Sequence, residues 1–157
     1  MHIVTGERVG QHGRLGVGCS AAVFDATHER VLLAQRADNG CWDVPGGYMD
    51  PGESFSKACA REVREETGLQ VRIARLIAVY TNPDLLLEYP DGNRWQLVVL
   101  HFEGEPVGGG LRASDETRGF SYFAKAEIAD LNMNPLGRMR ALDAFAEGEA
   151  ARIRDRF

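Results

Sequence analysis

The sequence is poor in features that define several classes of protein. It has three cysteines, Cys19, Cys41 and Cys59, with no CxxC pair, and four histidines without zinc-site spacing. Neither a disulfide scaffold nor a structural zinc site is therefore expected. No apolar stretch approaches the roughly 20 residues that cross a membrane, and no N-terminal run resembles a signal peptide. We expect free thiols and a cytoplasmic protein without a membrane partner.

A basic excess is also missing. Lys and Arg number 18 against 23 Asp and Glu, for a formal net charge of -5. Proteins that bind nucleic acid over a broad surface usually carry a basic excess, so the charge argues against such a surface. It does not exclude a small phosphate-bearing ligand, because a metal ion can supply the positive charge at such a site.

The size and composition are those of a folded domain. The chain has 157 residues, of which 44% are hydrophobic and 26% charged, values that are ordinary for one globular domain. We predict a single domain over residues 1–157, with residues 1–14 as a loosely structured lead-in. Whether residues 3–4 add a short edge strand is left open.

The spacing of the hydrophobic residues and the positions of turn-forming residues predict the helices and strands. Strands are expected at 15–24, 31–36, 42–48, 71–80, 85–89, 95–102 and 120–123, and helices at 54–67, 125–131 and 135–154. The first two strands are predicted to pair as a hairpin, and so are 85–89 and 95–102, around a Pro-Asp-Gly-Asn turn. The segment 104–114 is rich in glycine and is predicted to be a loop. The expected fold class is α+β, an α/β/α sandwich with a mixed sheet between the central helix and a C-terminal helix.

Acidic residues gather on one face of the predicted helix 54–67. Glu62, Glu65 and Glu66 stand at positions i, i+3 and i+4, which are neighbours on a helix surface. Like charges there are destabilising unless something compensates them. One explanation is a solvated face on which Arg61 and other basic residues form surface ion pairs, which are common and contribute little.

A solvated face does not explain the glycines that precede the helix. Gly46 and Gly47 follow Pro45, and glycines permit close approach of a ligand to the backbone. A glycine carbonyl aimed at a carboxylate cluster offers the oxygen ligands that Mg²⁺ or Mn²⁺ prefers. A bound divalent cation would also compensate the repulsion between the glutamates.

The stretch 47–69, GYMDPGESFSKACAREVREETGL, resembles the Nudix box, G-x5-E-x7-R-E-U-x-E-E-x-G-U, where U is a bulky aliphatic residue. All fixed positions are filled, by Gly47, Glu53, Arg61, Glu62, Val63, Glu65, Glu66, Gly68 and Leu69. The resemblance implies a Nudix-type fold and a hydrolase that cleaves a nucleoside diphosphate linked to another group X. In that family the diphosphate linkage is broken by metal-activated water attack on phosphorus.

The same resemblance implies roles within the box. Glu62, Glu65 and Glu66 would hold Mg²⁺ or Mn²⁺ together with the Gly47 carbonyl, and Glu62 or Glu66 would also transfer a proton. Arg61 would orient Glu62 and Glu53 through charge-assisted hydrogen bonds, with Glu53 holding the loop and helix together.

Residues outside the box are weaker candidates. Arg36 has the position of a phosphate-contacting arginine in some relatives, or is a surface residue at a strand end. Trp42 would stack on a base, or lies in the core. In many relatives a further acid after the box acts as a general base or an extra metal ligand. Here the first candidate is Glu116 and the second is Asp115, with Glu103 and Glu105 as further options.

The box does not identify X. Pro83 lies 83 − 69 = 14 positions beyond Leu69, one short of the place, about 15 on, that marks ADP-ribose-type substrates in the family. Leu86 occupies the place where dinucleoside polyphosphate enzymes have a tyrosine. Two enzyme readings remain: a (d)NTP or modified-nucleotide pyrophosphohydrolase, and an ADP-ribose or nucleotide-sugar pyrophosphatase.

A non-catalytic nucleotide sensor of the same fold is the alternative to an enzyme. Such proteins usually lose box acids, and this chain keeps all of them. Monomer and homodimer are both left open.

Overall fold

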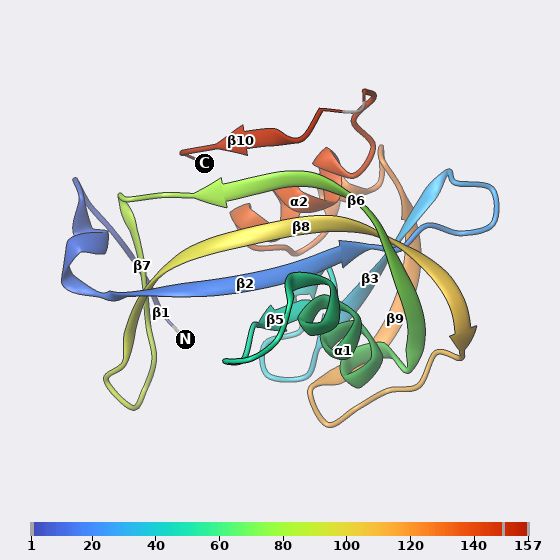
Figure 1. Cartoon of the computed structure of the whole chain (residues 1–157), viewed down its shortest axis with the longest axis horizontal. Coiled ribbons are helices and arrows are strands. Elements are labelled where there is room, and N and C mark those ends of the chain that lie inside the picture. Colours follow the sequence, from blue (N-terminus) through green and yellow to red (C-terminus); the bar gives the residue numbers. More distant parts are fainter. Residues whose placement is uncertain (1, 149, 157) are drawn as a thin grey trace.

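The structure, a computed structural model, describes residues 2–148 and 150–156. Within these residues, two α-helices, two 3-10 helices (η) and a set of β-strands follow one another (Figure 1). In order they are β1 (His2–Thr5), η1 (Val9–His12), β2 (Arg14–Ala22), β3 (Arg30–Arg36), β4 (Trp42–Asp43), β5 (Gly46–Tyr48), α1 (Phe55–Thr67), β6 (Leu69–Thr81), β7 (Leu85–Glu88), β8 (Arg94–Gly109), β9 (Thr117–Ala124), η2 (Ile128–Asp130), α2 (Pro135–Asp143) and β10 (Arg152–Arg154). Among the described residues, no helix is long and apolar enough to cross a membrane.

The larger of two sheets is mixed and forms the centre of the molecule. β2 runs parallel to β8, while β6 is antiparallel to β8 and β5 is antiparallel to β2. β7 and β1 extend the sheet at one end, and β10 adds to β6 in parallel. The smaller sheet has the order β4-β3-β9. The β2–β5 pairing brings the glycines of β5 against the central strand.

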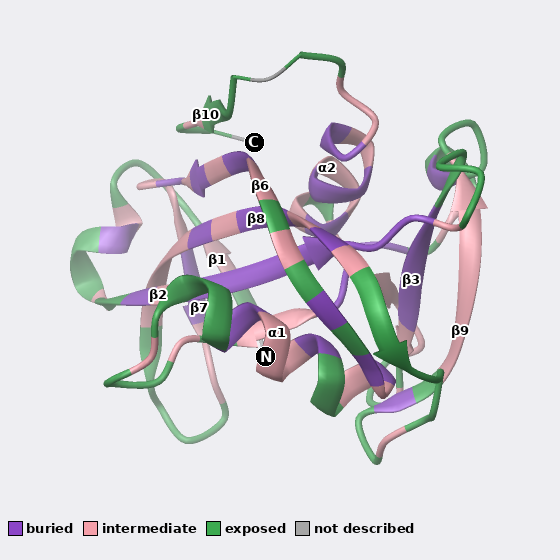
Figure 2. Cartoon of the chain, turned by 45° about the vertical axis from the view of Figure 1, so that its right-hand side comes forward, coloured by how far each residue is buried: buried purple, intermediate pink, exposed green. Residues whose placement is uncertain are grey.

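Two hydrophobic clusters lie on opposite faces of the large sheet. Cys19 and Ala21 of β2 pack in the cluster that contains Val63 of α1, whereas Ala22 packs in the cluster that contains Ala141 of α2. This alternation is the two-residue period of a strand that is buried on both faces. Figure 2 shows β2 buried over most of its length, while α1 turns an exposed face to solvent. The predicted α+β sandwich is confirmed.

Helix α1 has the ends that the sequence predicts. The Ser54 hydroxyl accepts a hydrogen bond from the Lys57 N–H at 3.4 Å, which caps the start of the helix. At the other end Gly68 has a φ of 80°, and its N–H donates to the Arg64 carbonyl at 2.8 Å. A left-handed glycine of this kind ends a helix without steric cost. All three cysteines are free thiols, as predicted.

One of the two predicted hairpins is wrong. The segments 15–24 and 31–36 are strands, but within the described chain they meet only at the bridge between Phe24 and Val31 before separating into different sheets. β2 prefers the long β8 as its partner, and β3 pairs with β9. The second hairpin is confirmed, because Leu87 faces Trp95 across β7 and β8.

Four further elements differ from the sequence predictions. The predicted loop 104–114 begins as strand, because β8 continues to Gly109 along β6. The predicted helix 125–131 is only the 3-10 helix η2, and the predicted helix 135–154 ends at Asp143. The lead-in predicted to be loose contains β1 and η1, and β1 pairs with β7.

The chain beyond α2 returns to the sheet because Asp143 holds it there. The buried carboxylate of Asp143 accepts hydrogen bonds from Arg154 at 2.6 and 3.1 Å, from Arg152 at 3.1 Å and from the Tyr80 hydroxyl at 2.8 Å. A carboxylate with this many donors stabilises β10 against β6, which a continuing helix could not provide.

Candidate active site

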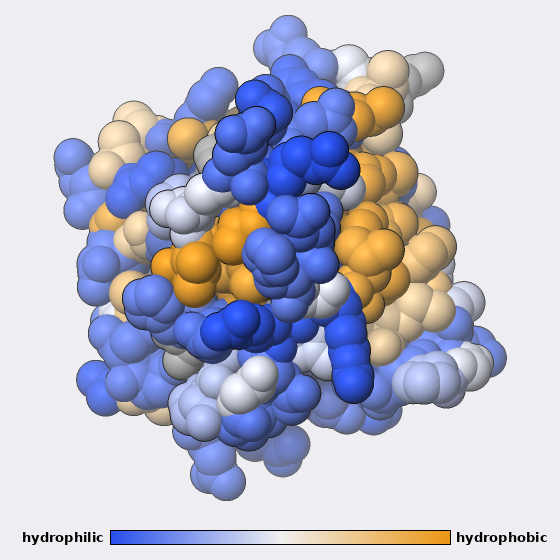
Figure 3. Space-filling model, turned by 90° about the vertical axis from the view of Figure 1, so that its left-hand side faces the viewer, coloured by the Kyte–Doolittle hydropathy of each residue, from blue (hydrophilic) through white to orange (hydrophobic). Residues whose placement is uncertain are grey.

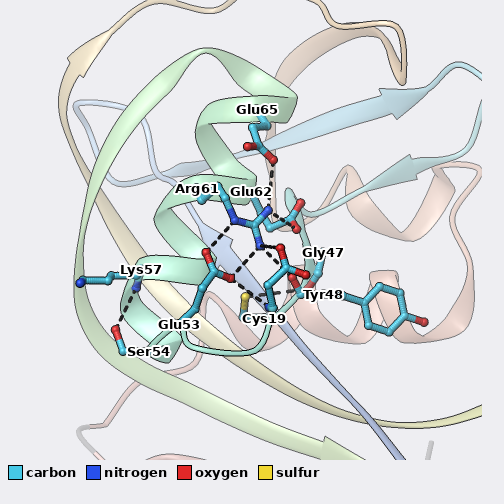
Figure 4. Close-up of polar contacts among 10 residues, drawn as sticks. Cys19, Gly47, Tyr48, Glu53, Ser54, Lys57, Arg61, Glu62 and Glu65 are labelled. Carbon is cyan, nitrogen blue, oxygen red and sulfur yellow. Dashed lines mark hydrogen bonds and ion pairs between the residues drawn. The ribbon is translucent and has the colours of Figure 1, made fainter. Parts of the chain in front are cut away.

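Arg61 of α1 connects the helix to the loop that precedes it. Its guanidinium donates to both carboxylate oxygens of Glu53 at 2.8 Å, to Glu62 at 2.8 Å, to Glu65 at 3.1 Å and to the Tyr48 carbonyl at 3.0 Å (Figure 4). These hydrogen bonds lower the pKa of Glu53 to about 2 and raise the pKa of Arg61. The contacts that the box predicts for Arg61 are present, and the orienting role stays a prediction.

Glu66 is the most enclosed carboxylate of the box. Its Oε2 accepts a hydrogen bond from the Gly46 N–H at 2.8 Å. Burial raises its pKa to about 7, and the negative charges of Glu62, Asp43 and Glu116 act in the same direction, against the lowering effect of the Gly46 hydrogen bond. Glu66 is therefore poised to exchange a proton near neutral pH when no cation is bound.

The glycines of β5 allow the carboxylates to approach the backbone. A Cβ at Gly47 would lie 2.4 Å from the Glu62 carboxylate, and a Cβ at Gly46 would lie 2.2 Å from the Cys19 carbonyl. Burial also raises the pKa of Glu62, although Arg61 opposes the shift. No larger residue could occupy either position without moving its neighbours.

The predicted metal ligands are assembled only in part. Glu62, Glu65 and Glu66 lie on α1 beside Gly47, but Arg61 engages Glu62 and Glu65, while the Gly46 N–H engages Glu66. Glu65 also has half of its side chain exposed, at 53%. Among the described residues, no group of three or more His, Cys, Asp or Glu side chains is arranged to hold an ion. The sequence thus placed the acids on the right element but not their rotamers.

The donor chemistry nevertheless fits a hard divalent cation. The available atoms are carboxylate oxygens and a glycine carbonyl, the ligands that Mg²⁺ and Mn²⁺ prefer. Two of the carboxylates, Glu62 and Glu66, have raised pKa values because they are buried beside other negative charges. A cation would remove that electrostatic cost.

Glu116 reaches this site from a distant part of the sequence. It precedes β9 and lines a small cavity of about 50 Å³ together with Glu66 and Arg36. Its charge contributes to the raised pKa values of Glu62 and Glu66. Glu116 is therefore brought to the site as the sequence suggested.

The other acidic options are placed elsewhere. Glu103 and Glu105 form ion pairs with Arg75 and Arg72 of β6, away from both cavities. Asp115 lines neither cavity. A role for Glu103, Glu105 or Asp115 as the further acid therefore gains no support from the cavities and stays a prediction.

The two residues predicted to bind substrate have different outcomes. Arg36 lines the small cavity, but its guanidinium forms a two-pronged pair with Asp38, at 2.9 and 2.8 Å. Trp42 lines neither cavity, and its ring packs edge-on against Phe123 at 4.9 Å between centroids. The ring also packs against the core beside α2, and base stacking by Trp42 stays a prediction.

A larger cavity of about 270 Å³ adjoins the box, and sequence reasoning missed it. Its apolar wall comes from strands β1, β7 and β8, with Ile3, Leu85, Leu87, Leu97 and Val99. The face that carries β1 and β7 exposes apolar side chains in patches separated by a hydrophilic band (Figure 3). The run of leucines at 85–87 was the available signal, but only the fold places these strands beside the box.

Polar groups from the box loop and α2 complete this cavity. Asn134 caps α2 by accepting the Gly137 N–H at 2.7 Å and donates to Asp43 at 3.2 Å. Near the box, the hydroxyls of Tyr48 and Tyr89 lie 2.9 Å apart. The cavity therefore combines apolar walls with a few polar groups, which is typical of sites for small organic ligands.

Comparison with known proteins identifies the family. A family model described as the NUDIX domain matches residues 14–143. The chain belongs to the Nudix family. It is a Nudix hydrolase by the same evidence, because its relatives are named for diphosphate cleavage.

Three similar proteins illustrate the range within the Nudix family. A MutT-like protein of Streptomyces ambofaciens is 34% identical over 80% of this chain and 73% of the relative. An ADP-ribose pyrophosphatase of Methanocaldococcus jannaschii is 35% identical over 68% of this chain and 57% of the relative. The crystal structure of an ADP-ribose pyrophosphatase from Streptococcus suis has a TM-score of 0.65 and 25% identity, covering 88% of this chain and 98% of that one.

Proposed function

We propose that the protein is a divalent-metal-dependent hydrolase of the diphosphate linkage in a nucleoside diphosphate bound to a group X. The observation that carries the proposal is that the two cavities are neighbours. The larger one suits a nucleoside in size and polarity, and Asp43, Gly46 and Arg140 line both it and the small carboxylate-lined cavity. A nucleotide bound across the two cavities would present its diphosphate to Glu66 and Glu116.

Glu62, Glu66 and the Gly47 carbonyl are the atoms that would hold Mg²⁺ or Mn²⁺, with Glu65 available after it leaves Arg61. When bound, the ion would neutralise the charge of the diphosphate and lower the pKa of a water molecule. Both carboxylates have raised pKa values without an ion, which supports their use as ligands.

The remaining side chains either orient the carboxylates or transfer protons. Arg61 holds Glu53 and Glu62 in fixed orientations through hydrogen bonds of 2.8 Å. The Glu116 carboxylate lies beside Glu66 and can accept a proton from the attacking water. Glu66 can serve as the base instead, and substitution of each residue separates the two possibilities.

A (d)NTP or modified nucleotide is the first candidate substrate. The carboxylate-lined cavity has a volume of about 50 Å³, which suits phosphate oxygens better than a second sugar. An ADP-ribose or nucleotide-sugar substrate is the second candidate. It is favoured by the relatives named ADP-ribose pyrophosphatase.

Product analysis tests the proposal. Purified protein is incubated with dNTPs, ADP-ribose, nucleotide sugars and dinucleoside polyphosphates, first with Mg²⁺ and then with Mn²⁺, beside Glu66→Gln. Release of pyrophosphate identifies the first candidate, and AMP with a sugar phosphate identifies the second. Tight nucleotide binding without turnover under either metal would refute hydrolysis and support a sensor. Monomer and homodimer remain alternatives, which sedimentation of the same sample distinguishes.

A further inference from the structure

Arg140 of α2 borders both cavities. Only Asp43, Gly46 and Arg140, among the described residues, line both the apolar cavity and the carboxylate-lined one. Gly46 has no side chain, so the side chains that line both cavities are the carboxylate of Asp43 and the guanidinium of Arg140. In a nucleotide that spans the two cavities, the group at this position is the phosphate that joins the nucleoside to X.

The guanidinium of Arg140 is buried and has donors to spare. Arg140 is 9% exposed, and its Nη2 donates to Asp43 Oδ1 at 2.7 Å. Among the described residues its Nε has no hydrogen-bond partner. An arginine has five N–H donors in a planar fork, and leaving them unmatched in a buried place has a free-energy cost. Nε itself is enclosed by protein, so the donors that a ligand with several acceptor oxygens would engage are the remaining N–H groups of the fork.

Asp43 holds the guanidinium of Arg140 in place but does not pair with all of its N–H donors. Its Oδ1 also accepts the Val44 N–H at 2.8 Å, and its Oδ2 accepts the Asn134 amide at 3.2 Å. The carboxylate therefore has little capacity left for the remaining guanidinium donors. The ion pair fixes the orientation of the Arg140 guanidinium and leaves some of its N–H groups available to a ligand.

Arg140 holds α2 to β4 through Asp43, but a neighbouring arginine also docks this helix. Arg138 donates to the carbonyls of Ile128, Ala129 and Leu131 at 2.5, 2.5 and 2.7 Å. Arg138 lines neither cavity. Two arginines on one short helix thus have separate roles, and Arg138 is a matched control.

The second arginine of the carboxylate-lined cavity is less suited to a buried phosphate. Arg36 is 44% exposed at its side chain and is engaged by Asp38 through two hydrogen bonds. The nearby acids Glu66 and Glu116 repel an anion, and a buried guanidinium would add to the positive charge that the proposed metal ion supplies. Arg140 is the buried cation that lines this cavity.

We propose that Arg140 binds the phosphate attached to the nucleoside and so positions the scissile linkage. This inference deepens the proposed function and rests on its substrate class, a nucleoside phosphate. Arg140 is then a substrate-binding residue that distinguishes phosphorylated from unphosphorylated nucleosides. Its planar fork matches phosphate oxygens in a way that lysine does not.

The test compares ligands that differ only by a phosphate. Binding of AMP and adenosine, and of dGMP and deoxyguanosine, is measured by calorimetry with Mg²⁺ present. In wild type the monophosphate should bind more tightly than its nucleoside. Arg140→Gln should reduce that preference at least tenfold and leave nucleoside affinity within about twofold, because charge-assisted hydrogen bonds to phosphate are lost. Arg140→Lys should keep part of the preference, and Arg138→Gln all of it.

Three results would overturn the inference: an equal loss for nucleoside and monophosphate, an unchanged preference, or no binding of any pair by wild type. If Arg140→Gln unfolds because Asp43 loses its partner, the double variant Asp43→Asn, Arg140→Gln replaces the ion pair with two neutral amides, and the same criteria apply. Turnover of the substrate panel is scored separately. A lost phosphate preference without any wild-type turnover would refute hydrolysis and leave the Arg140 assignment intact.

Discussion

Arg61 donates to both carboxylate oxygens of Glu53, at 2.8 Å each, and the two residues are eight positions apart in the chain. This two-pronged pair connects the loop before α1 to the middle of the helix. The same guanidinium reaches Glu62, so the orientation of one candidate ligand depends on the pair.

Arg61→Gln should therefore impair catalysis more than folding. The variant loses the hydrogen bonds to Glu53 and Glu62, and we expect kcat to fall by at least about 100-fold while unfolding free energy falls by roughly 1–3 kcal/mol. Steady-state rates and urea melts measure the two effects. Arg64→Gln, at an exposed position of the same helix, is the control and should change neither by more than about 0.5 kcal/mol. An active Arg61→Gln enzyme would contradict the role.

Glu66 should make the stability of the metal-free protein depend on pH. Its folded-state pKa is raised by burial to about 7 from the ordinary value of 4.5. Its contribution is therefore fully present below pH 4.5 and is lost as pH rises through 7. Glu66→Gln does not ionise, so in EDTA it should be more stable than wild type at pH 8, by up to about 2–3 kcal/mol, with no difference near pH 4.5.

Urea melts of Glu66→Gln and wild type across pH 4.5–8 measure that difference. Added Mg²⁺ should stabilise wild type at pH 8 and have much less effect on the variant, because a ligand that binds only the folded state raises stability. A difference that is constant across the pH range would show that Glu66 ionises normally in the folded protein.

The two glycines of β5 should respond differently to alanine. At Gly47 the new Cβ meets the Glu62 carboxylate, the mobile end of a side chain, at 2.4 Å. Gly47→Ala should therefore fold, with kcat reduced at least about tenfold because Glu62 is displaced. At Gly46, where φ is 157°, the Cβ meets the Cys19 carbonyl at 2.2 Å and the Ser20 Cα at 2.5 Å, which are backbone atoms. Gly46→Ala should lose more than about 2 kcal/mol of stability. Thermal melts and kcat distinguish the two, and the reverse order would contradict this prediction.

Glu116 should matter to the reaction and Asp115 should not. Glu116→Gln removes an acid from the carboxylate-lined cavity, and we expect kcat to fall at least about 100-fold if it accepts the proton from water. Asp115→Asn, one residue earlier and outside both cavities, is the matched control and should stay within about twofold. A Glu116→Gln enzyme with normal kcat would assign proton transfer to the box glutamates.

Asp143 should hold the C-terminal strand. Burial raises its pKa, but Arg154, Tyr80 and Arg152 outweigh that effect and the net pKa is lowered. Asp143→Asn should therefore lose roughly 2–4 kcal/mol at pH 7, and this difference should shrink as pH falls and the wild-type carboxylate takes up a proton. Urea melts measure the loss, and hydrogen exchange should show faster opening of β10. Asp155→Asn, an exposed acid of the same segment, is the control.

The sequence predicted best where a local signal and the tertiary structure agree. Helix α1 has its cap at Ser54 and its end at Gly68, because both signals act within one turn of the helix. The turn at Asp91-Gly92 closes β7 onto β8 for the same reason.

Local signals failed where distant partners decide. The helical pattern beyond Asp143 gave way to β10, because Asp143 offers Arg152 and Arg154 a buried carboxylate beside β6. The expected hairpin of β2 and β3 did not form, because β8 gives β2 a longer partner. Trp42 packs edge-on against Phe123 of β9, a contact between distant segments that no local signal predicts.

By itself the sequence determined the family, the acidic face of α1 and the oxygen chemistry of the proposed metal site, because these depend on residue types at fixed spacing along one helix. Only the tertiary structure decided which pocket adjoins that face. The larger cavity draws on β1, β7, β8 and the start of α2, which are far apart in the chain. The side chains that it shares with the carboxylate-lined cavity are Asp43 and Arg140, 97 residues apart and 2.7 Å from each other. No periodicity predicts such a pair, because the fold rather than the local chain brings the two side chains together.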